Sequence, residues 1–584
     1  MTRARLTAAD LHPFGDLDVW RLLLSRVAAG GDRPFVTWAP FDGPSRTWTY
    51  RELARDAARV AAGLARRGVG AGDRVLIHLE NSPEFLMAWF GCAALGAVAV
   101  TTNTRSAGDE LAYYADDCGA VAAVTQPRFA ELMAASAPAV RFQVCTDHDG
   151  GQPGTVLGES FEALLGDPDD VPARPVDPLA PMSVQYTSGT TSRPKGVLWT
   201  QANALWGARV NAAHETLRPD DCHLVYLPLF HTNALAYSML ATLWTGARMV
   251  LIPKWSSSRF WDISLRHGCT FLSLMGLTQR FVLAGEPPAR HSYRLFGAGV
   301  CDMPSDARYG VKTIGWWGMT ETITHPVIGD AFLPNRPLSM GRPAGEYEVR
   351  VVREDGGTPV EPEETGQLQV RGTAGLSLFA EYLNQPEATE QSFDDDGWFR
   401  TGDLVTAHAD GHLSFANREK DMLRVGAENV SAAEVERVIL GITGVLEAAV
   451  VGRPDDKLDE VPVVFIRAAD GAAAGPAGDS GPGSGNGSAN SADIGSGNSA
   501  DNGSDNGSDN GSGLAARVAA ECAARLADFK VPRAVYLVRE LPRSTLSKVD
   551  KKELRAVAEP DGDRAAAQAR WIAAAAADPS GDAS

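Results

Sequence analysis

The 584-residue sequence lacks the cysteine patterns of metal-stabilised and disulfide-rich proteins. Its seven cysteines form no CxxC pair and no cluster with histidine at zinc-ligand spacing, which argues against a zinc finger or zinc ribbon. An odd number of widely separated cysteines is typical of free thiols in a reducing compartment. We therefore expect a cytoplasmic protein.

The chain also has little that points to a membrane. No apolar segment follows the arginines of the N-terminus, so no signal peptide is indicated. The longest uncharged apolar stretch covers residues 85–100 and contains Gly91 and Gly96. A membrane-spanning helix needs about 20 residues, so we interpret this stretch as a buried helix followed by a strand.

Positive charge is in deficit. The chain has 54 Lys and Arg against 73 Asp and Glu, a formal net charge of −19. Broad nucleic-acid surfaces need a dense set of Lys and Arg to displace counterions, so this balance argues against such a partner. Small anionic ligands are not excluded, because a few local donors suffice to hold them.

Most of the sequence has the pattern of an α/β protein. From about residue 47 to 467, apolar runs alternate with helical patterns, such as residues 51–69 followed by the strand-like DRVLIHL. This alternation predicts mainly parallel strands in α/β layers. Residues 468–513 are rich in Gly, Ser, Asn and Asp and have almost nothing to bury, so we expect an unstructured insertion there. The Ala-rich segment 559–584 is expected to be a flexible tail.

The most informative segment is PMSVQYTSGTTSRPKGVLWT, residues 181–200. An apolar strand leads into a loop of hydroxyl side chains and glycines that ends near a lysine, a composition suited to binding polyphosphate. The order GxxxxGK[ST] is missing, which argues against a P-loop ATPase. An ordinary Ser/Thr/Gly turn remains the alternative for this loop taken alone. The candidate phosphate-binding residues are Thr187, Ser188, Gly189, Thr190, Thr191 and Lys195.

Seven segments in matching order resemble the adenylate-forming, or AMP-binding, superfamily that includes acyl-CoA synthetases. They are YTSGTTSRPKG, LPLFHTNAL, GWWGMTET, TGQLQVRG, WFRTGD, NREKDMLRVGAENVSAAEVE and LPRSTLSKVDKKEL, and together they cover about residues 20–555. The wording GMTETITHPVIGD and GRPAGEYEV is most similar to the carnitine or crotonobetaine CoA ligase branch. The resemblance implies a large N-terminal AMP-binding domain, residues 1–416, and a small mobile α+β lid domain, residues 417–558, interrupted by the insertion.

The resemblance also implies roles for residues around the nucleotide. Trp317 resembles the aromatic residue beside adenine, Thr320 the hydroxyl at the α-phosphate, and Glu321 the ligand of Mg²⁺. Asp403, which we expect to end the strand-like WFRTGD, and Arg418 resemble the pair at the ribose. Core packing for the tryptophans, a turn cap for Asp403 and a surface position for Arg418 are the alternatives from the residues alone.

The acyl and thiol sides of the site are implied in the same way. His231 resembles the gate between the acyl pocket and the thiol channel, and Trp316 is a candidate wall of that pocket. By itself, a histidine that follows Phe230 in an apolar run is more often a buried core residue. Gly426 would line the channel for CoA, where a pantetheine arm must come close to the backbone. Ala427 stands where the family often has a second glycine.

Two lysines complete the resemblance. Lys548 matches the catalytic lysine that stabilises charge at the α-phosphorus, although its KVDKK surroundings also fit a solvated basic face. Leu546 and Ser547 replace the usual Ser and Gly there, which puts the conformation of this loop in doubt. Lys420 matches the hinge between the two domains.

The implied reaction is ATP-dependent activation of a carboxylic acid. The carboxylate would attack the α-phosphorus of MgATP to form an acyl-adenylate, and CoA would then accept the acyl group. Two alternatives stay open: transfer to a carrier-protein pantetheine, an amine or another nucleophile, and a non-catalytic nucleotide sensor. The sequence leaves open which acid is used, whether the protein is a monomer or a homodimer, and whether the insertion has a role.

Overall fold

The computed structural model describes residues 12–187, 193–275, 286–303, 305–353, 357–418, 422–426, 428–468, 511–542 and 549–558. The chain divides into two compact units. Unit 1 contains residues 1–422 and 526–528, and unit 2 contains residues 423–525 and 529–584. The two units are described separately below.

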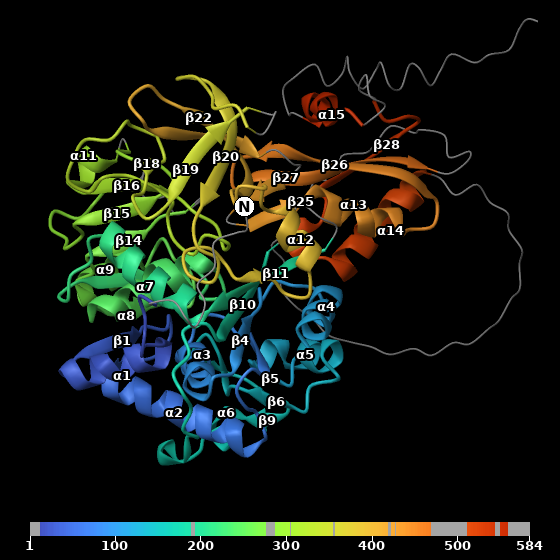
Figure 1. Ribbon diagram of the computed structural model, residues 1–584. Helices are drawn as coiled ribbons and strands as arrows, with labels where there is room; N and C mark the ends of the chain where they lie inside the picture. Colours follow the sequence, from blue (N-terminus) through green and yellow to red (C-terminus); the bar gives the residue numbers. More distant parts are fainter. Residues whose placement is uncertain are drawn as a thin grey trace, which may run out of the picture. The chain divides into compact units, whose positions relative to one another are not determined.

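Unit 1 contains a mostly parallel sheet that begins the α/β pattern (Figure 1). Its order is β21 (Glu381–Tyr382), β11 (Lys195–Thr200), β10 (Pro181–Thr187), β4 (Val98–Thr101), β3 (Arg74–His78), β5 (Ala122–Thr125), β6 (Phe142–Cys145) and β9 (Glu159–Ser160). Neighbours from β10 to β9 are parallel, whereas β10 and β11 form an antiparallel pair. The helices that accompany these strands are α2 (Tyr50–Arg66), α3 (Pro83–Leu95), α4 (Gly108–Cys118), α5 (Ala130–Ser136) and α6 (Phe161–Leu164).

Helix α3 confirms the interpretation of the apolar stretch. Ser82 caps its first turn by accepting from the Phe85 amide, and Pro83 occupies the first helical position, where its missing N–H costs nothing. The helix ends at Gly96 with φ +78°, a left-handed conformation that favours glycine. Strand β4 follows directly. None of the helices in the described ranges is long and apolar enough to cross a membrane.

A second sheet of unit 1 supplies most of the site residues. Its order is β18 (Arg342–Pro343), β17 (Val327–Ile328), β16 (Lys312–Trp317), β15 (Leu295–Ala298), β14 (Phe271–Ser273), β12 (Cys222–Val225), β13 (Arg248–Leu251), β1 (Pro34–Trp38) and β2 (Arg46–Thr49). Helices that accompany it are α1 (Val19–Gly30), α7 (Gln201–His214), the π-helix η3 (Asn233–Leu240), α8 (Ala241–Thr245), α9 (Phe260–His267) and α11 (Asp306–Tyr309). One apolar cluster joins the two sheets and includes Trp89, Trp199, Leu235, Trp317 and Phe399.

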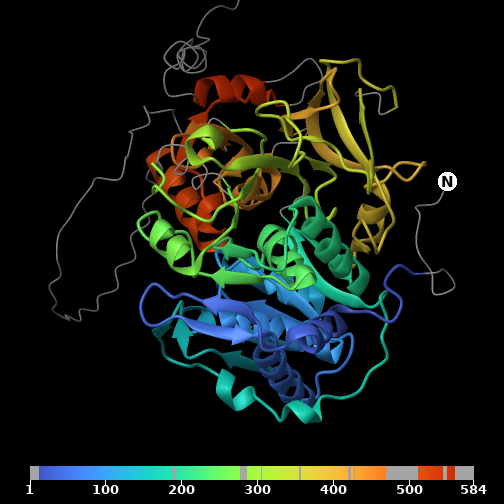
Figure 2. The same cartoon turned by 90° about the vertical axis from the view of Figure 1, so that its left-hand side faces the viewer.

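A smaller antiparallel sheet completes unit 1 and appears as the yellow and orange strands in Figure 2. It contains β19 (Glu348–Val352), β20 (Thr365–Arg371), β22 (Phe399–Ala407) and β23 (Leu413–Arg418), and the short helix α12 (Pro386–Gln391) precedes β22.

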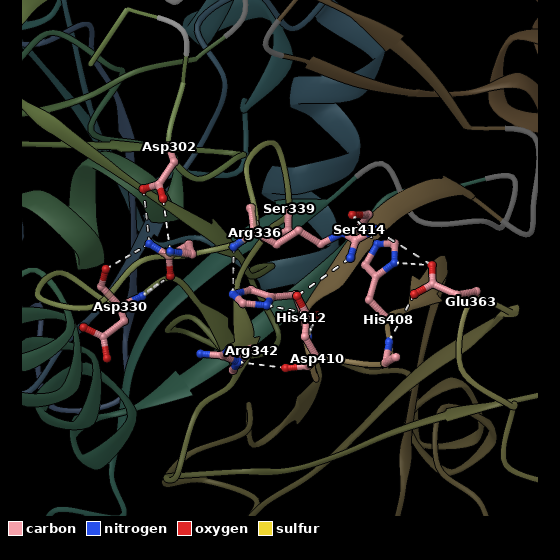
Figure 3. A network of polar contacts seen from close by, with 12 residues as sticks. Asp302, Asp330, Arg336, Ser339, Arg342, Glu363, His408, Asp410, His412 and Ser414 are labelled. Atoms are coloured by element: carbon pink, nitrogen blue, oxygen red, sulfur yellow. Dashed lines mark hydrogen bonds and ion pairs between the residues drawn. The ribbon is translucent and has the colours of Figure 1, made fainter. Parts of the chain in front are cut away.

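A polar network fixes the turn between β22 and β23 (Figure 3). The backbone N–H of Arg336 donates to Nε2 of His412 over 3.1 Å, and Nε of Arg342 donates to the carbonyl of Asp410 over 3.2 Å. These bonds tie the segment after β17 to the turn that joins the two strands. Further members of the network are Asp302, Asp330, Ser339, Glu363, His408 and Ser414.

Unit 2 is an α+β unit. Its strands are β24 (Met422–Val425), β25 (Glu428–Ser431), β26 (Val445–Asp455), β27 (Asp459–Ala468) and β28 (Ala534–Val538), and its helices are α13 (Ala432–Leu440), α14 (Gly511–Arg525) and α15 (Lys551–Ala558). Strand β27 continues to Ala468 and α14 begins at Gly511, so the edges of the expected insertion, 468 and 511–513, belong to regular elements.

The predicted α/β class with a smaller second α+β unit is therefore confirmed. All seven cysteines carry free thiols and all are buried.

Candidate active site

Trp317 and Asp403 meet in the interior of unit 1. Trp317 is the last residue of β16, and its indole Nε1–H donates to Oδ2 of Asp403 over 2.8 Å. Both side chains are buried, with Asp403 only 2% exposed. The structure thus joins the GWWGMTET and WFRTGD segments, which lie 86 residues apart.

Asp403 does not end its strand, and the expectation that it would was wrong. Strand β22 continues through Ala407, and Asp403 is the register partner of Arg418 on β23. Gly402 has φ +75° although it lies inside the strand. This left-handed conformation favours glycine and is more often found in turns. The turn-cap alternative for Asp403 is excluded by this position. The side chain of Arg418 lies outside the described part of the chain.

The predicted phosphate loop lies in the sequence between the antiparallel strands β10 and β11. Thr187 is the last residue of β10, Lys195 is the first of β11, and the two are register partners. The strands therefore hold both ends of the loop at one edge of the sheet. Ser188, Gly189, Thr190 and Thr191 lie outside the described residues.

Tyr382 contacts both Lys195, the first residue of β11, and Glu321. Its hydroxyl donates to Oε1 of Glu321 over 2.9 Å, and Nζ of Lys195 lies 4.4 Å from the centroid of its ring. Burial, together with the Glu321 carboxylate, raises the pKa of the Tyr382 hydroxyl well above its ordinary value, so the phenol remains protonated and acts as the donor. One tyrosine thus fixes the carboxylate predicted to bind Mg²⁺ and contacts the predicted phosphate lysine.

Thr320 lies in a second polar cluster. Its hydroxyl is 3.1 Å from that of Thr232, which in turn donates to Oε1 of Gln185 over 2.7 Å. Its carbonyl accepts from the indole Nε1–H of Trp199 over 2.9 Å. Because Gln185 is in β10 and Trp199 in β11, Thr320 is held directly against the two strands that flank the predicted phosphate loop.

His231 and Trp316 take different positions. His231 is half-buried just before η3, with its ring centroid 4.7 Å from that of Phe230. Trp316 is buried and stacks on His325, with centroids 4.5 Å apart and planes within 11°. Trp316 is therefore packed against an aromatic ring, and it directly precedes Trp317, which contacts Asp403.

The remaining predicted residues fall elsewhere. Lys548 and Lys420 lie outside the described residues. Gly426 belongs to unit 2, where it follows β24 with φ +64° and its N–H donates to the Leu458 carbonyl over 2.6 Å. This left-handed backbone position is one that a glycine adopts readily.

The Glu321 carboxylate, next to Thr320 in the sequence, suits a magnesium ion that binds together with phosphates. Within the described ranges, no group of three or more His, Cys, Asp or Glu side chains could hold a metal by itself. A single carboxylate such as Glu321, with phosphate oxygens and water, is the arrangement that Mg²⁺ commonly takes at nucleotide sites. The residues therefore fit a metal that binds together with the nucleotide.

Sequence reasoning missed four residues that organise this site: Tyr382, Thr232, Gln185 and Trp199. Tyr382 stands in β21, which pairs with β11 through Val197, and no local pattern singles it out. Thr232 is adjacent to the predicted gate His231, and Gln185 precedes the phosphate loop by three residues. Proximity to those motifs was the available signal for these two.

Comparison with known proteins identifies related sequences. The AMP-binding enzyme family model matches residues 24–383. Crotonobetaine/carnitine–CoA ligase of Proteus mirabilis (strain HI4320) is 30% identical over 537 residues, covering 88% of this chain and 94% of the relative. The protein of the same name from Escherichia coli O7:K1 is 32% identical over 447 residues, covering 74% and 85%.

Solved structures show the same fold. A double mutant of the o-succinylbenzoate CoA synthetase of Bacillus subtilis superposes with a TM-score of 0.71 at 24% identity, covering 92% of this chain and 98% of that one. A fatty acyl CoA synthetase of Mycobacterium tuberculosis gives 0.60 at 25% identity, covering 92% and 97%. The chain therefore belongs to the AMP-binding enzyme family and is an ATP-dependent acyl-CoA synthetase that works through an acyl-adenylate.

Proposed function

We propose that this synthetase activates a small, polar carboxylic acid and passes it to CoA. The curated relatives are named for crotonobetaine and carnitine, which are acids of this kind. Their agreement with this chain extends over most of both sequences, which supports a related substrate. A pocket can change through few substitutions, so the acid itself needs a direct test.

The nucleotide roles rest on the contact between Trp317 and Asp403. In this assignment the ring of Trp317 lies along adenine, and Asp403 and Arg418 accept and donate hydrogen bonds at the ribose. The bond from Trp317 leaves Oδ2 of Asp403 fixed at 2.8 Å from the indole nitrogen. A carboxylate already oriented before the nucleotide arrives loses less freedom on binding.

The phosphate roles rest on the clusters around Thr320 and Glu321. Thr187, Ser188, Gly189, Thr190, Thr191 and Lys195 are assigned to the phosphates, and Thr320 to the α-phosphate. Glu321 is assigned to Mg²⁺, which supplies charge neutralisation at the phosphates when it is bound. Tyr382 orients the Glu321 carboxylate, and the loop strands orient Thr320.

The first chemical step needs no general base. The substrate carboxylate is ionised at neutral pH and attacks the α-phosphorus, forming the acyl–phosphate bond while the bond to pyrophosphate breaks. Lys548 is assigned to stabilise the negative charge that develops there. In the second step the CoA thiol attacks the acyl carbonyl and AMP leaves; His231 and Gly426 are assigned to the thiol channel and Lys420 to the hinge.

A panel of carboxylic acids tests the proposal. Pyrophosphate release is measured for each acid with ATP and Mg²⁺, with and without CoA. Release that depends on a small polar acid, and thioester formation that depends on CoA, are the expected results. Sustained turnover without CoA would show another acceptor, and preference for long apolar acids would contradict the assigned substrate class.

The free thiols also support a cytoplasmic location. Seven buried cysteines without a disulfide fit a reducing compartment, and we assign the protein to the cytoplasm. Fractionation of the native host, with the protein found in the membrane or secreted fraction, would contradict this assignment.

A further inference from the structure

The side-chain amide of Gln185 is bonded at its oxygen only. Gln185 lies on β10 and is 3% exposed. Its Oε1 accepts the hydroxyl hydrogen of Thr232 over 2.7 Å, whereas its buried Nε2 has no hydrogen-bond partner in the part of the chain that the structure describes. A buried N–H group without a partner is destabilising, and such groups are uncommon in folded proteins. This donor is therefore available for a second arrangement of the same contacts.

The side chains next to Gln185 form a short chain of hydroxyl groups. Thr232 contacts both Gln185 and Thr320, and its hydroxyl oxygen lies 3.1 Å from that of Thr320. A hydroxyl group carries one hydrogen. While Thr232 donates to Gln185, a hydrogen bond between the two threonines must therefore use the hydrogen of Thr320. In this arrangement Thr320 offers lone pairs, and no hydrogen, to any further group.

That arrangement does not suit the role assigned to Thr320 at the α-phosphate. Phosphate oxygens are ionised and accept hydrogen bonds, so Thr320 has to donate to one. Trp199 donates to the carbonyl of Thr320 over 2.9 Å and holds its backbone, which leaves the hydroxyl hydrogen as the part that can turn. If the chain stays intact, Thr320 then accepts from Thr232, and Thr232 accepts from Gln185. Only the Nε2 end of the Gln185 amide can donate that bond.

We propose that the carboxamide of Gln185 turns by half a rotation when the nucleotide binds, and that this directs the hydroxyl hydrogen of Thr320 toward the α-phosphate. The turn places Nε2 where Oε1 was, so one hydrogen bond to Thr232 replaces another. Gln185 acts through Thr232 and Thr320 and is a positioning residue. The proposal rests on the function proposed above, through the assignment of Thr320 to the α-phosphate.

Gln185→Glu fixes the direction of the chain. An ionised carboxylate accepts and cannot donate, so Thr232 and then Thr320 must donate toward position 185. Gln201→Glu is the matched control: Gln201 is a buried glutamine on α7 whose Oε1 accepts from the Val19 amide over 3.1 Å. Each variant introduces the same carboxylate into the interior of unit 1, but only the first one does so next to Thr232.

Binding of AMP and of adenosine, measured by calorimetry at pH 8.0, isolates the contact with the α-phosphate, because the two ligands differ only in that group. Gln185→Glu should raise the Kd for AMP by about tenfold or more, since a donor to a charged group is lost, and should leave the Kd for adenosine unchanged. The control should keep the original ratio of the two Kd values. An unchanged ratio in Gln185→Glu would overturn the proposal.

Thr232→Val distinguishes the hydroxyl chain from direct repulsion between a carboxylate and the phosphate. The substitution removes the hydroxyl that links position 185 to Thr320. In the Thr232→Val background, Gln185→Glu should therefore change the Kd for AMP by less than about threefold, which is a coupling that a double-mutant cycle measures. A full tenfold loss in that background would show repulsion and contradict the proposal.

The unaltered protein gives a second test, which does not depend on the folding of Gln185→Glu. With ¹⁵N-labelled glutamine, the side-chain amide signal that disappears in Gln185→Met belongs to Gln185. AMP should shift this signal and adenosine should not, because only AMP brings the phosphate. A signal that AMP leaves in place would overturn the proposal.

The same measurements separate this proposal from the proposed function. If the unaltered protein binds AMP no more tightly than adenosine, the assignment of Thr320 is wrong and the role of Gln185 fails with it, while pyrophosphate release still decides the substrate. If the binding results are as expected and no carboxylic acid releases pyrophosphate, the proposed function fails and the role of Gln185 at the phosphate stands.

Discussion

The indole N–H of Trp317 donates to the buried carboxylate of Asp403 across 2.8 Å. This bond joins two strands of different sheets of unit 1, β16 and β22. It gives the nucleotide assignment its firmest geometric basis, because it places an aromatic ring and an oriented acceptor beside each other.

Replacing Trp317 with Phe should weaken ATP binding while keeping a ring for adenine. A buried carboxylate that loses a hydrogen-bond donor is destabilised by about 1–3 kcal/mol, so the KM for ATP should rise by roughly 5- to 150-fold. Steady-state pyrophosphate release at varied ATP measures this effect. Trp261→Phe is the matched control, because Trp261 is on α9 and packs against a different apolar cluster. An equal KM in Trp317→Phe and the control would count against the assigned role.

Tyr382→Phe tests how Glu321 is held. The substitution keeps the ring beside Lys195 and removes only the hydroxyl that donates to Glu321. The loss of about 1 kcal/mol in orientation should raise the Mg²⁺ concentration for half-maximal activity by about fivefold, with maximal activity recovered at high Mg²⁺. Titration of Mg²⁺ at fixed total ATP gives the answer, and Glu321→Gln should show a larger loss that Mg²⁺ does not restore. An unchanged Mg²⁺ requirement in Tyr382→Phe would refute the assigned orientation.

The sequence was sufficient for the motifs and the α/β layers, but not for the contacts between motifs. Helices α2 and α3 and strand β3 could be predicted because local periodicity and capping residues determine them. The pairing of Asp403 with Arg418, and the bond from Trp317, depend on tertiary register, and Tyr382 enters the site only because β21 pairs with β11. The β22 boundary was missed because Gly402 adopts a positive φ inside a strand, a position that resembles a turn in the letters alone.

Lys530 and Glu434 form a buried ion pair in unit 2. Nζ of Lys530 lies 2.9 Å from Oε1 of Glu434, with side-chain exposures of 5% and 2%. Removing one charge leaves the other buried without its partner, which typically costs about 3–5 kcal/mol. Lys530→Met should therefore destabilise unit 2, which is observed as faster amide exchange in strands β26 and β27. The double variant Lys530→Met, Glu434→Leu should exchange more slowly than Lys530→Met alone. If amide exchange in Lys530→Met is as slow as in the unaltered protein, this estimate is wrong.

Two buried histidines should make the protein less stable in mild acid. Burial lowers the pKa of His78 and of His223 from 6.5 to about 3. Between about pH 3 and 6.5 the unfolded chain binds protons at these sites that the folded protein does not, so stability is present above pH 6.5 and falls as the pH decreases. Each histidine contributes up to about 1.4 kcal/mol per pH unit in that window.

His223→Phe isolates one of these contributions. The ring of His223 packs edge-on against Phe271 at 4.7 Å, so a phenyl group suits the site. Urea unfolding at pH 7.0, 6.0 and 5.5 should show a smaller loss of stability on acidification in the variant. Parallel pH dependences in the two proteins would show that His223 does not resist protonation in the fold.

The most direct test of the account is the product balance with a responsive small acid. Incubation of the enzyme with that acid, ATP, Mg²⁺ and CoA should yield AMP, pyrophosphate and acyl-CoA in equal amounts, and without CoA the acyl-adenylate should form on the enzyme at about one per active site. Formation of ADP and phosphate, or AMP release independent of the acid, would contradict carboxylate activation through an adenylate.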